Sequence, residues 1–148
     1  GYQKLSISYF TIMREKKMPV LVMFIDLDRL KYINDTFGHE YGDFAIVSIA
    51  KAMLKHCDAD AIAARTGGDE FIVLEGAKDE ESGRVLAQKI RTELSKTQRA
   101  MQLPFDLSAS IGAVVAHPGE ENVLESYVKR AEMLMYEEKA EKKVSRDS

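Results

Sequence analysis

Apolar residues recur along the chain with two periods, and these periods predict its secondary structure. The amino-terminal stretch predicts an opening helix that ends before Lys16. Its apolar residues at helical spacing are Leu5, Tyr9, Ile12 and Met13. The next stretch, PVLVMFID at residues 19–26, is a continuous apolar run, typical of a strand buried on both faces. The run stops at Asp26, so the predicted strand ends on a residue capable of chemistry.

The rest of the chain alternates the same two patterns. A short helix is expected over residues 29–36, with Phe37-Gly38 at its end. Residues 61–76 predict two strand arms around a Gly67-Gly68 turn, and residues 105–116 predict another strand. Three more amphipathic helices are expected. Their apolar stripes are Ile46, Val47, Ala50, Met53 and Leu54; then Leu86, Ile90 and Leu94; and finally Leu124, Val128, Ala131 and Met135.

After the opening helix, the order of elements is strand, helices, hairpin, helix, strand and helix. This order predicts an α+β fold of the ferredoxin-like, split βαββαβ type, with an antiparallel sheet flanked by helices and an extra N-terminal helix. The length of 148 residues, with 45% hydrophobic and 30% charged residues, fits one domain over residues 1–148. Such a fold supports many chemistries, so function has to be argued from the site.

Composition narrows the class of protein. A single cysteine, Cys57, excludes an internal disulfide framework, and no CxxC or HExxH spacing offers a zinc site. No apolar run is long enough to span a bilayer and no signal-peptide pattern opens the chain, so a cytoplasmic domain is expected. The net charge of -3 gives no indication of a surface for long nucleic acid. The net charge does not exclude a small phosphorylated ligand held through a metal, because such a ligand needs charge only at its binding site.

Three carboxylates are the first candidates for such a site. Asp26 ends the buried strand, whereas Asp69 and Glu70 follow the Gly67-Gly68 turn of the hairpin. Neighbouring strands of one sheet would bring the three together, and a divalent cation would offset their mutual repulsion. Magnesium suits oxygen ligands and phosphate substrates, and glycines let a ligand approach the backbone closely.

Each feature also has a simpler interpretation. A Gly-Gly-Asp turn between apolar arms is a common hairpin device, and Asp26 could cap the following short helix. The surrounding sequence, DLDRLKYINDTFGHEYGD at residues 26–43, favours the functional interpretation.

Four separate motifs resemble the GGDEF family of diguanylate cyclases, and together they extend over most of the chain. The signature is intact at residues 67–71. The other three are FIDLDRLKYINDTFGHEYGD at residues 24–43, LSASIGAV at residues 107–114 and YVKRAEMLMYEEK at residues 127–139. The family has a palm-type sheet and condenses two GTP molecules into cyclic di-GMP with release of two pyrophosphates. The resemblance therefore implies GTP as substrate and Mg²⁺ as cofactor, with Mn²⁺ as an alternative ion.

The resemblance also implies roles for individual residues. Asp26 and Asp69 would bind magnesium, with the carbonyl of Leu27 close to the metal. Glu70 would assist the 3′-hydroxyl or the metal pair. Asn34 and Asp43 would read the guanine edge, because an amide donates and accepts whereas a carboxylate accepts the guanine N1 and N2 hydrogens.

Further residues match phosphate-binding positions of the family. Backbone amides of Asp28, Arg29 and Leu30 would hold the terminal phosphates at the start of the short helix. Lys31 and Lys139 would add positive charge, although a single lysine is more often a solvated surface residue. Arg65 matches an arginine near the phosphates; its alternative role is a surface ion pair.

The chain departs from the family pattern in two places that bear on function. The arginine of an RxxD product-inhibition motif would stand at Asp58, within residues 58–61, so we expect no feedback inhibition there. Lys143 replaces a phosphate-gripping arginine and lacks its planar bidentate fork. The opening motif LTGLxNR is missing, so we expect an excised domain of a longer signalling protein with a regulatory or sensory domain. That longer protein could be anchored in a membrane.

The chemistry also predicts an assembly and leaves two alternatives. One such domain binds one GTP, so the product needs two copies facing each other as a homodimer. The first alternative is a catalytically weak GTP-binding regulatory module. The second is a scaffold or dimerisation domain that binds no nucleotide.

Overall fold

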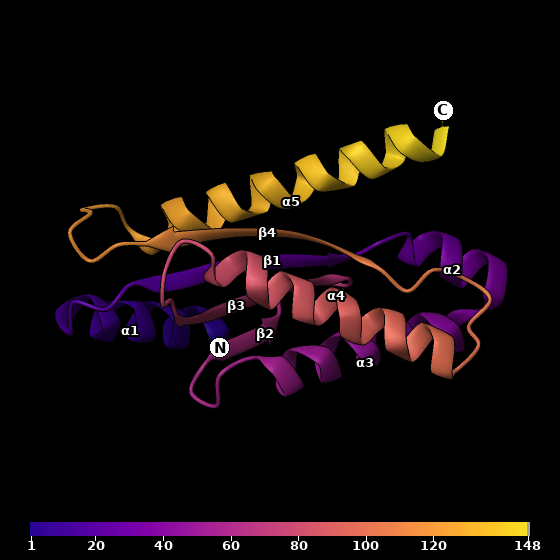
Figure 1. The fold of residues 1–148 in the computed structure, drawn as a ribbon, viewed down its shortest axis with the longest axis horizontal. Helices are drawn as coiled ribbons and strands as arrows, with labels where there is room; N and C mark the ends of the chain where they lie inside the picture. Colours follow the sequence, from indigo (N-terminus) through magenta and orange to yellow (C-terminus); the bar gives the residue numbers. More distant parts are fainter. Residues whose placement is uncertain (148) are drawn as a thin grey trace.

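A four-stranded antiparallel sheet and five helices make up the part of the chain that the computed structural model describes, residues 1–147 (Figure 1). The helices are α1 (Tyr2–Glu15), α2 (Leu30–Phe37), α3 (His39–His56), α4 (Ser82–Ala100) and α5 (Leu124–Asp147). The strands are β1 (Val20–Leu27), β2 (Ile62–Arg65), β3 (Glu70–Gly76) and β4 (Ala109–Ala116). The predicted α+β class with an N-terminal helix is confirmed.

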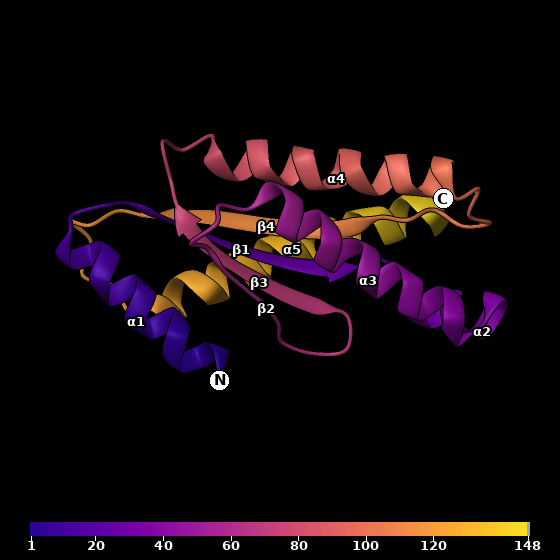
Figure 2. The same cartoon turned by 90° about the horizontal axis from the view of Figure 1, so that it is seen from below.

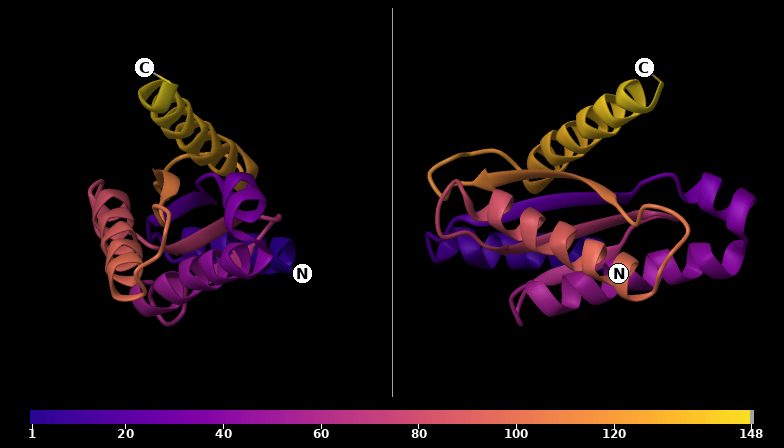
Figure 3. Two further views of the ribbon diagram at one scale, coloured as in Figure 1. Left: turned by 90° about the vertical axis from the view of Figure 1, so that its right-hand side faces the viewer. Right: turned by 45° about the vertical axis from the view of Figure 1, so that its right-hand side comes forward.

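The strand order β2-β3-β1-β4 places β1 in the interior of the sheet, between β3 and β4 (Figure 2). Helices cover both faces: α3 and α4 lie on one side, and α1 and α5 on the other (Figure 3). All eight residues of β1 are buried, which explains the continuous apolar run in the sequence. Odd-numbered residues such as Leu21 pack toward α3 and α4, whereas even-numbered ones such as Val22 pack toward α1 and α5.

Glycines allow two helices to approach β4 closely. A Cβ on Gly112 would lie 1.9 Å from the carbonyl oxygen of Ala131 in α5, and one on Gly83 in α4 would lie 2.8 Å from the Cβ of Ala113. The close approach to Gly112 lets α5 pack against the sheet. Lysines of α5 then lie at the end of β1.

The predicted elements are present, but two helices are rotated relative to expectation. In α1 the buried residues are Ser6, Phe10 and Met13, while Leu5 and Ile12 are exposed. In α3, Val47 and Leu54 are exposed. The buried residues of α3 are Gly42, Ala45, Ser48, Ile49, Ala52 and Met53. Among residues 1–147, no helix combines the length and the apolar character needed to cross a membrane.

Candidate active site

Three acidic side chains meet where β1 ends beside the turn between β2 and β3. Asp26 is directly opposite Glu70 in the antiparallel register, and the Leu27 amide donates a 2.9 Å hydrogen bond to the carbonyl oxygen of Asp69. Carboxylate oxygens of Asp26, Asp69 and Glu70 all lie within 4.8 Å of one another. The convergence predicted from the strand end and the turn is confirmed.

Asp26 is the buried member of this acidic cluster. It is an even-numbered residue of β1, so its side chain points toward α5, and it is only 5% exposed. Burial raises its pKa to about 7; the Lys139 ammonium opposes this rise, and the Asp69 carboxylate adds to it. Its Oδ1 is buried, and its partner among residues 1–147 is the Lys139 ammonium at 3.4 Å, a long contact. A close set of carboxylate oxygens, one of them buried and only loosely paired with an ammonium, fits the oxygen ligands that Mg²⁺ prefers.

α5 supplies positive charge to the cluster. Lys139 Nζ lies 3.4 Å from Asp26 Oδ1 and donates a 3.2 Å hydrogen bond to the carbonyl oxygen of Leu27. One turn earlier, the Tyr136 hydroxyl donates a 3.4 Å hydrogen bond to Glu70 Oε1. The family resemblance indicates Lys139, whereas the contact of Tyr136, which lies in the motif at residues 127–139, is seen only in the structure.

The predicted phosphate-binding turn connects β1 to α2. Arg29 adopts a left-handed conformation with φ 58°, and α2 begins at Leu30. The Asp28 amide already donates a 2.9 Å hydrogen bond to the carbonyl oxygen of Ser108. The helix-type bond from Ile33 N–H to the Arg29 carbonyl leaves the amides of Arg29 and Leu30 ahead of the helix, as at any helix start. These two amides are therefore better placed for an anion than that of Asp28.

The Asp28 side chain is the centre of a polar network that the sequence did not predict. It accepts hydrogen bonds from Ser110 Oγ at 2.6 Å, Ser108 Oγ at 2.8 Å and Lys142 Nζ at 2.7 Å. Burial alone would raise the pKa of Asp28, but the bonds from Lys142, Ser110 and Ser108 outweigh it and lower the pKa. Lys142 also donates to the Ala109 carbonyl oxygen at 2.8 Å. The network ties the start of the phosphate-binding turn to β4 and α5.

Two adjacent lysines of α5 therefore differ in position. Lys142 is half-buried against Asp28, whereas Lys143, the predicted phosphate-binding residue, is exposed. Lys31, predicted to add charge near the phosphates, is exposed on the first turn of α2.

The predicted guanine-reading residues come from α2 and the start of α3. A Cβ on Gly42 would lie 1.8 Å from Asn34 Oδ1, so the Asn34 side chain lies directly against the backbone at Gly42. Asp43 is the next residue and is exposed. Gly38, with φ 101°, ends α2 and starts α3, which folds the two helices against each other. The structure thus brings Asn34 beside Gly42, the residue before Asp43. Only glycine at position 42 permits this contact, which the sequence pattern does not predict.

The turn of the signature is held by its own arginine. Arg65 Nε donates to the carbonyl oxygens of Gly67 at 3.0 Å and Gly68 at 3.1 Å, and its Nη2 donates to Gly68 at 2.6 Å. Arg65 thus stabilises the turn, and within residues 1–147 no carboxylate lies within 4.0 Å of it to form the alternative surface ion pair. Neither glycine has a positive φ, and a Cβ on Gly68 would meet nothing within 4 Å. Backbone conformation therefore does not require glycine at these positions, and the space beside Gly68 is open to a ligand.

The segment at residues 58–61 lies at the other end of the β2–β3 hairpin. Asp58 and Asp60 are exposed, and the Asp58 amide donates a 2.9 Å hydrogen bond to Glu75 Oε1. Burial raises the pKa of Glu75, and the charges of Asp58 and Asp60 add to the rise, while the hydrogen bond from the Asp58 amide opposes it. A third carboxyl group thus lies beside the two exposed aspartates of this segment.

Comparison with known proteins assigns the family. The family model described as "Diguanylate cyclase, GGDEF domain" matches residues 2–145. The chain belongs to the GGDEF domain family. The probable diguanylate cyclase DgcT of Escherichia coli (strain K12) is 36% identical over 127 residues, covering 84% of this chain and 28% of DgcT. The cyclic di-GMP phosphodiesterase PdeR of the same strain is 30% identical over 115 residues, covering 78% of this chain and 17% of PdeR.

A solved structure shows the same fold. The GGDEF domain of DgcB from Caulobacter crescentus, in complex with c-di-GMP, superposes with a TM-score of 0.76 at 26% identity, covering 94% of this chain and 82% of that one. The GGDEF domain described here spans only a minor part of its curated relatives, and their names include both a cyclase and a phosphodiesterase. Activity must therefore be argued from the acidic cluster and its surroundings.

Proposed function

We propose that this GGDEF domain is a diguanylate cyclase, which condenses two GTP molecules into cyclic di-GMP and two pyrophosphates as a face-to-face dimer. The observation that carries the proposal is the cluster of Asp26, Asp69 and Glu70 beside Lys139. A scaffold domain has no need for a buried carboxylate whose pKa is raised to about 7, since such a group costs stability unless a ligand uses it. Family membership and the cyclase names of relatives such as DgcT agree with this activity.

Mg²⁺ would be held by Asp26, Asp69 and Glu70, with the Leu27 carbonyl nearby. A bound divalent ion would lower the pKa of the 3′-hydroxyl and neutralise charge on the phosphates. Lys139 lies at the same cluster, so its ammonium offsets the charge that develops there. The amides of Arg29 and Leu30 would bind the β- and γ-phosphates, and Lys31 and Lys143 lie on the two helices adjoining the turn.

Guanine would bind near Asn34 and Asp43. The Asn34 amide and the Asp43 carboxylate offer complementary partners for the guanine edge: the carboxylate accepts the N1 and N2 hydrogens, which adenine does not present in that arrangement. Asp43 therefore favours guanine over adenine.

In the reaction, the 3′-oxygen of one GTP forms a bond to the α-phosphorus of the other. The bond from that phosphorus to the bridging oxygen of the β-phosphate breaks, and one pyrophosphate leaves. The same step with the two nucleotides exchanged closes the ring and releases the second pyrophosphate. Glu70 would receive the 3′-hydroxyl proton, and the Tyr136 hydroxyl, 3.4 Å from Glu70 Oε1, would orient this carboxylate. Because one domain supplies one GTP, two domains must face each other, and the initial rate would rise with the square of protein concentration.

The test is direct. The protein is incubated with Mg²⁺ and GTP, and cyclic di-GMP is quantified by liquid chromatography. Glu70→Gln should abolish product formation while circular dichroism shows an unchanged fold, and Glu121→Gln, an exposed control, should retain full activity. Product formation by Glu70→Gln at the wild-type rate would refute the role of Glu70, and a proven monomer with full activity would refute the dimer.

The second candidate is a catalytically weak GTP-binding module. It is favoured by the position of two lysines. Lys142 is paired with Asp28, which leaves Lys143 to bind phosphate. Lys143 stands where the family has an arginine, and it lacks the bidentate fork of that side chain. Calorimetry with a non-hydrolysable GTP analogue separates the candidates. Binding of the analogue without turnover of GTP identifies the module, whereas turnover identifies the enzyme.

A further inference from the structure

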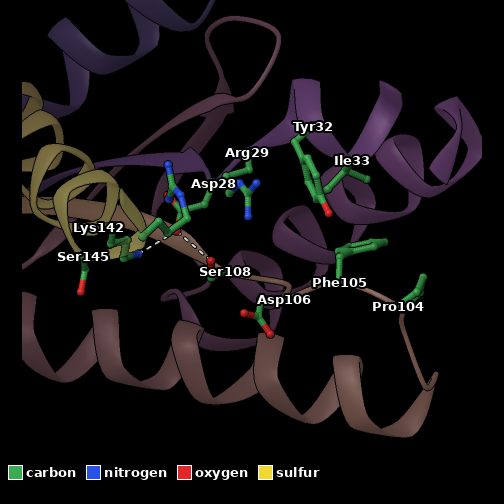
Figure 4. A pocket seen from close by; sticks show the side chains of 11 residues that line it. Asp28, Arg29, Tyr32, Ile33, Pro104, Phe105, Asp106, Ser108, Lys142 and Ser145 are labelled. Atoms are coloured by element: carbon green, nitrogen blue, oxygen red, sulfur yellow. Dashed lines mark hydrogen bonds and ion pairs between the residues drawn. The ribbon is translucent and has the colours of Figure 1, made fainter. Parts of the chain in front are cut away.

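A cavity of about 450 Å³ lies between the start of α2, the segment at residues 104–108 and the last turns of α5 (Figure 4). Its lining includes neither the metal-cluster residues Asp26 and Asp69 nor the guanine-site residues Asn34 and Asp43. It shares Asp28 and Arg29 with the phosphate-binding turn and so adjoins the candidate active site there. Its volume falls within the range of about 300–1,000 Å³ that is usual for small-ligand sites.

One end of the cavity is apolar and aromatic. Tyr32, Ile33 and Phe105 line it, and Figure 4 shows them on the same side, away from α5. Arg29 stacks on the Tyr32 ring with its Cζ 3.9 Å from the ring centroid. The Phe105 ring is fixed by packing against Phe37, with 5.5 Å between centroids. Phe105 is only 8% exposed, whereas Tyr32 is 42% exposed. The Arg29–Tyr32 pair is therefore the planar surface on which a ring from outside the chain can stack.

The other end is polar and cationic. Lys142 and Arg146 of α5 line it together with Ser108, which Figure 4 shows in contact with Asp28. The Asp28 carboxylate already accepts hydrogen bonds from two serine hydroxyls and from Lys142. Over residues 1–147, neither Arg29 nor Arg146 has a carboxylate within 4.0 Å. Two guanidinium groups are thus available to an anion from outside the chain.

The remaining acidic residue of the lining does not cancel this charge. Asp106 is exposed and accepts a 3.3 Å hydrogen bond from Gln98 on α4. The lining therefore has three cations against two carboxylates, of which one is internally compensated. The rings lie at one end, Lys142 and Arg146 lie at the other, and Arg29 lies on the Tyr32 ring. A ligand with one planar part and one anionic part fits this arrangement.

We propose that this cavity is an accessory binding site for a small phosphomonoester with a planar ring, of the size of a nucleoside monophosphate. The ring would stack on the Arg29–Tyr32 pair beside the edge of Phe105, and the phosphate would pair with Arg146. The site does not depend on cyclase activity, because none of its ligand contacts involves the acidic cluster. Asp28 and Arg29 line the cavity and also form the phosphate-binding turn. A ligand in the cavity would therefore contact the residues that position this turn.

The test uses adenosine 5′-monophosphate, because its base suits a stacking site but not a guanine-selective one. Binding is followed by amide chemical shifts in ¹⁵N-labelled protein that has been saturated with a non-hydrolysable GTP analogue. Saturable shifts are expected at Tyr32, Phe105 and Arg146. Adenosine and inorganic phosphate, each matching one end of the cavity, should bind more weakly than the nucleotide.

Two surface variants locate the site. Arg146→Ala and Tyr32→Ala should each weaken binding about tenfold, as expected for loss of one charge-assisted or stacking contact. Arg99→Ala, an exposed arginine at the end of α4, and Asp43→Ser should leave it unchanged. Absence of saturable binding at millimolar nucleotide, or binding insensitive to Arg146→Ala and Tyr32→Ala, overturns the proposal. Loss of binding in Asp43→Ser also overturns it, because the nucleotide would then occupy the guanine site.

Discussion

Lys139 Nζ lies 3.4 Å from Asp26 Oδ1, so the last helix of the chain supplies the nearest positive charge to the buried member of the acidic cluster. The same ammonium is hydrogen bonded to the Leu27 carbonyl oxygen. The lysine thus lies against two of the groups proposed to surround a metal. Any ion that enters the cluster must share these oxygens with Lys139 or displace it.

The first prediction concerns Lys139→Met. The ammonium lowers the pKa of Asp26, which burial has raised to about 7, so its removal should raise this pKa further. Turnover of GTP should fall about 10²-fold, in line with loss of one electrostatic contact at a reacting centre. A carboxyl-carbon NMR titration measures the pKa, and Lys129→Met, an exposed lysine of the same helix, is the control. An unchanged pKa would show that the ion pair is absent in solution.

The second prediction concerns Asp26→Asn and magnesium. Addition of Mg²⁺ should raise the melting temperature of the wild-type protein, since a ligand at 100 times its Kd adds about 2.7 kcal/mol to the free energy of unfolding. The amide cannot replace a buried carboxylate as a metal ligand, so the variant should gain nothing. Without metal, the variant should match or exceed the wild type, because a buried charge beside Asp69 has been removed.

The control is Asp60→Asn, which neutralises an exposed carboxylate far from the cluster in the fold. It should show the wild-type response to Mg²⁺ in a differential scanning fluorimetry series. A magnesium-dependent shift that survives in Asp26→Asn would place the ion elsewhere.

The acidic cluster could be predicted from the sequence because each of its residues lies at the end of a strand or beside a turn. Asp26 ends an apolar run and Asp69 follows a turn, and antiparallel pairing of two such strands leaves little choice about where their ends meet. Helix faces were less predictable. Val47 and Leu54 of α3 are exposed because a helix turns by about 100° per residue, so apolar residues on two adjoining faces leave its rotation undecided.

The network around Asp28 could not be predicted for a related reason. Ser108 and Ser110 alternate in sequence and so share one face of the strand region, but only the register of β1 with β4 places them on Asp28. The choice between Lys142 and Lys143 depends on the rotation of α5, which is fixed by its contact with Gly112. Long-range packing, not local pattern, decides these positions.

Gly112→Ala provides the third prediction and tests that packing. The new Cβ would lie 1.9 Å from the Ala131 carbonyl oxygen and 2.5 Å from the Met135 amide nitrogen, so α5 must move away from β4. The free energy of unfolding should fall by about 3 kcal/mol, the upper part of the usual range for overpacking. Gly119→Ala is the matched control, because its Cβ would meet nothing within 4 Å. Urea unfolding measures both, and equal stabilities would contradict the close approach of α5.

The fourth prediction concerns Ser110→Ala and pH. The pKa of Asp28 is lowered from its ordinary value of 3.8 in the folded protein, so its ionisation contributes stability above pH 3.8 that is lost as pH falls through the folded pKa. Removal of the 2.6 Å bond from the buried Ser110 hydroxyl should raise that pKa and cost about 1–3 kcal/mol at pH 7.

The pH dependence separates this effect from simple loss of packing. Urea unfolding of Ser110→Ala and wild type should differ most at neutral pH and converge as Asp28 is protonated in acid, and the acid-unfolding midpoint of the variant should move to higher pH. Ser95→Ala, at an exposed position of α4, should follow the wild-type curve. A stability difference that stays constant from pH 7 into acid would mean that the hydroxyl acts only by filling space, and the charge of Asp28 would then be held by Ser108 and Lys142 alone.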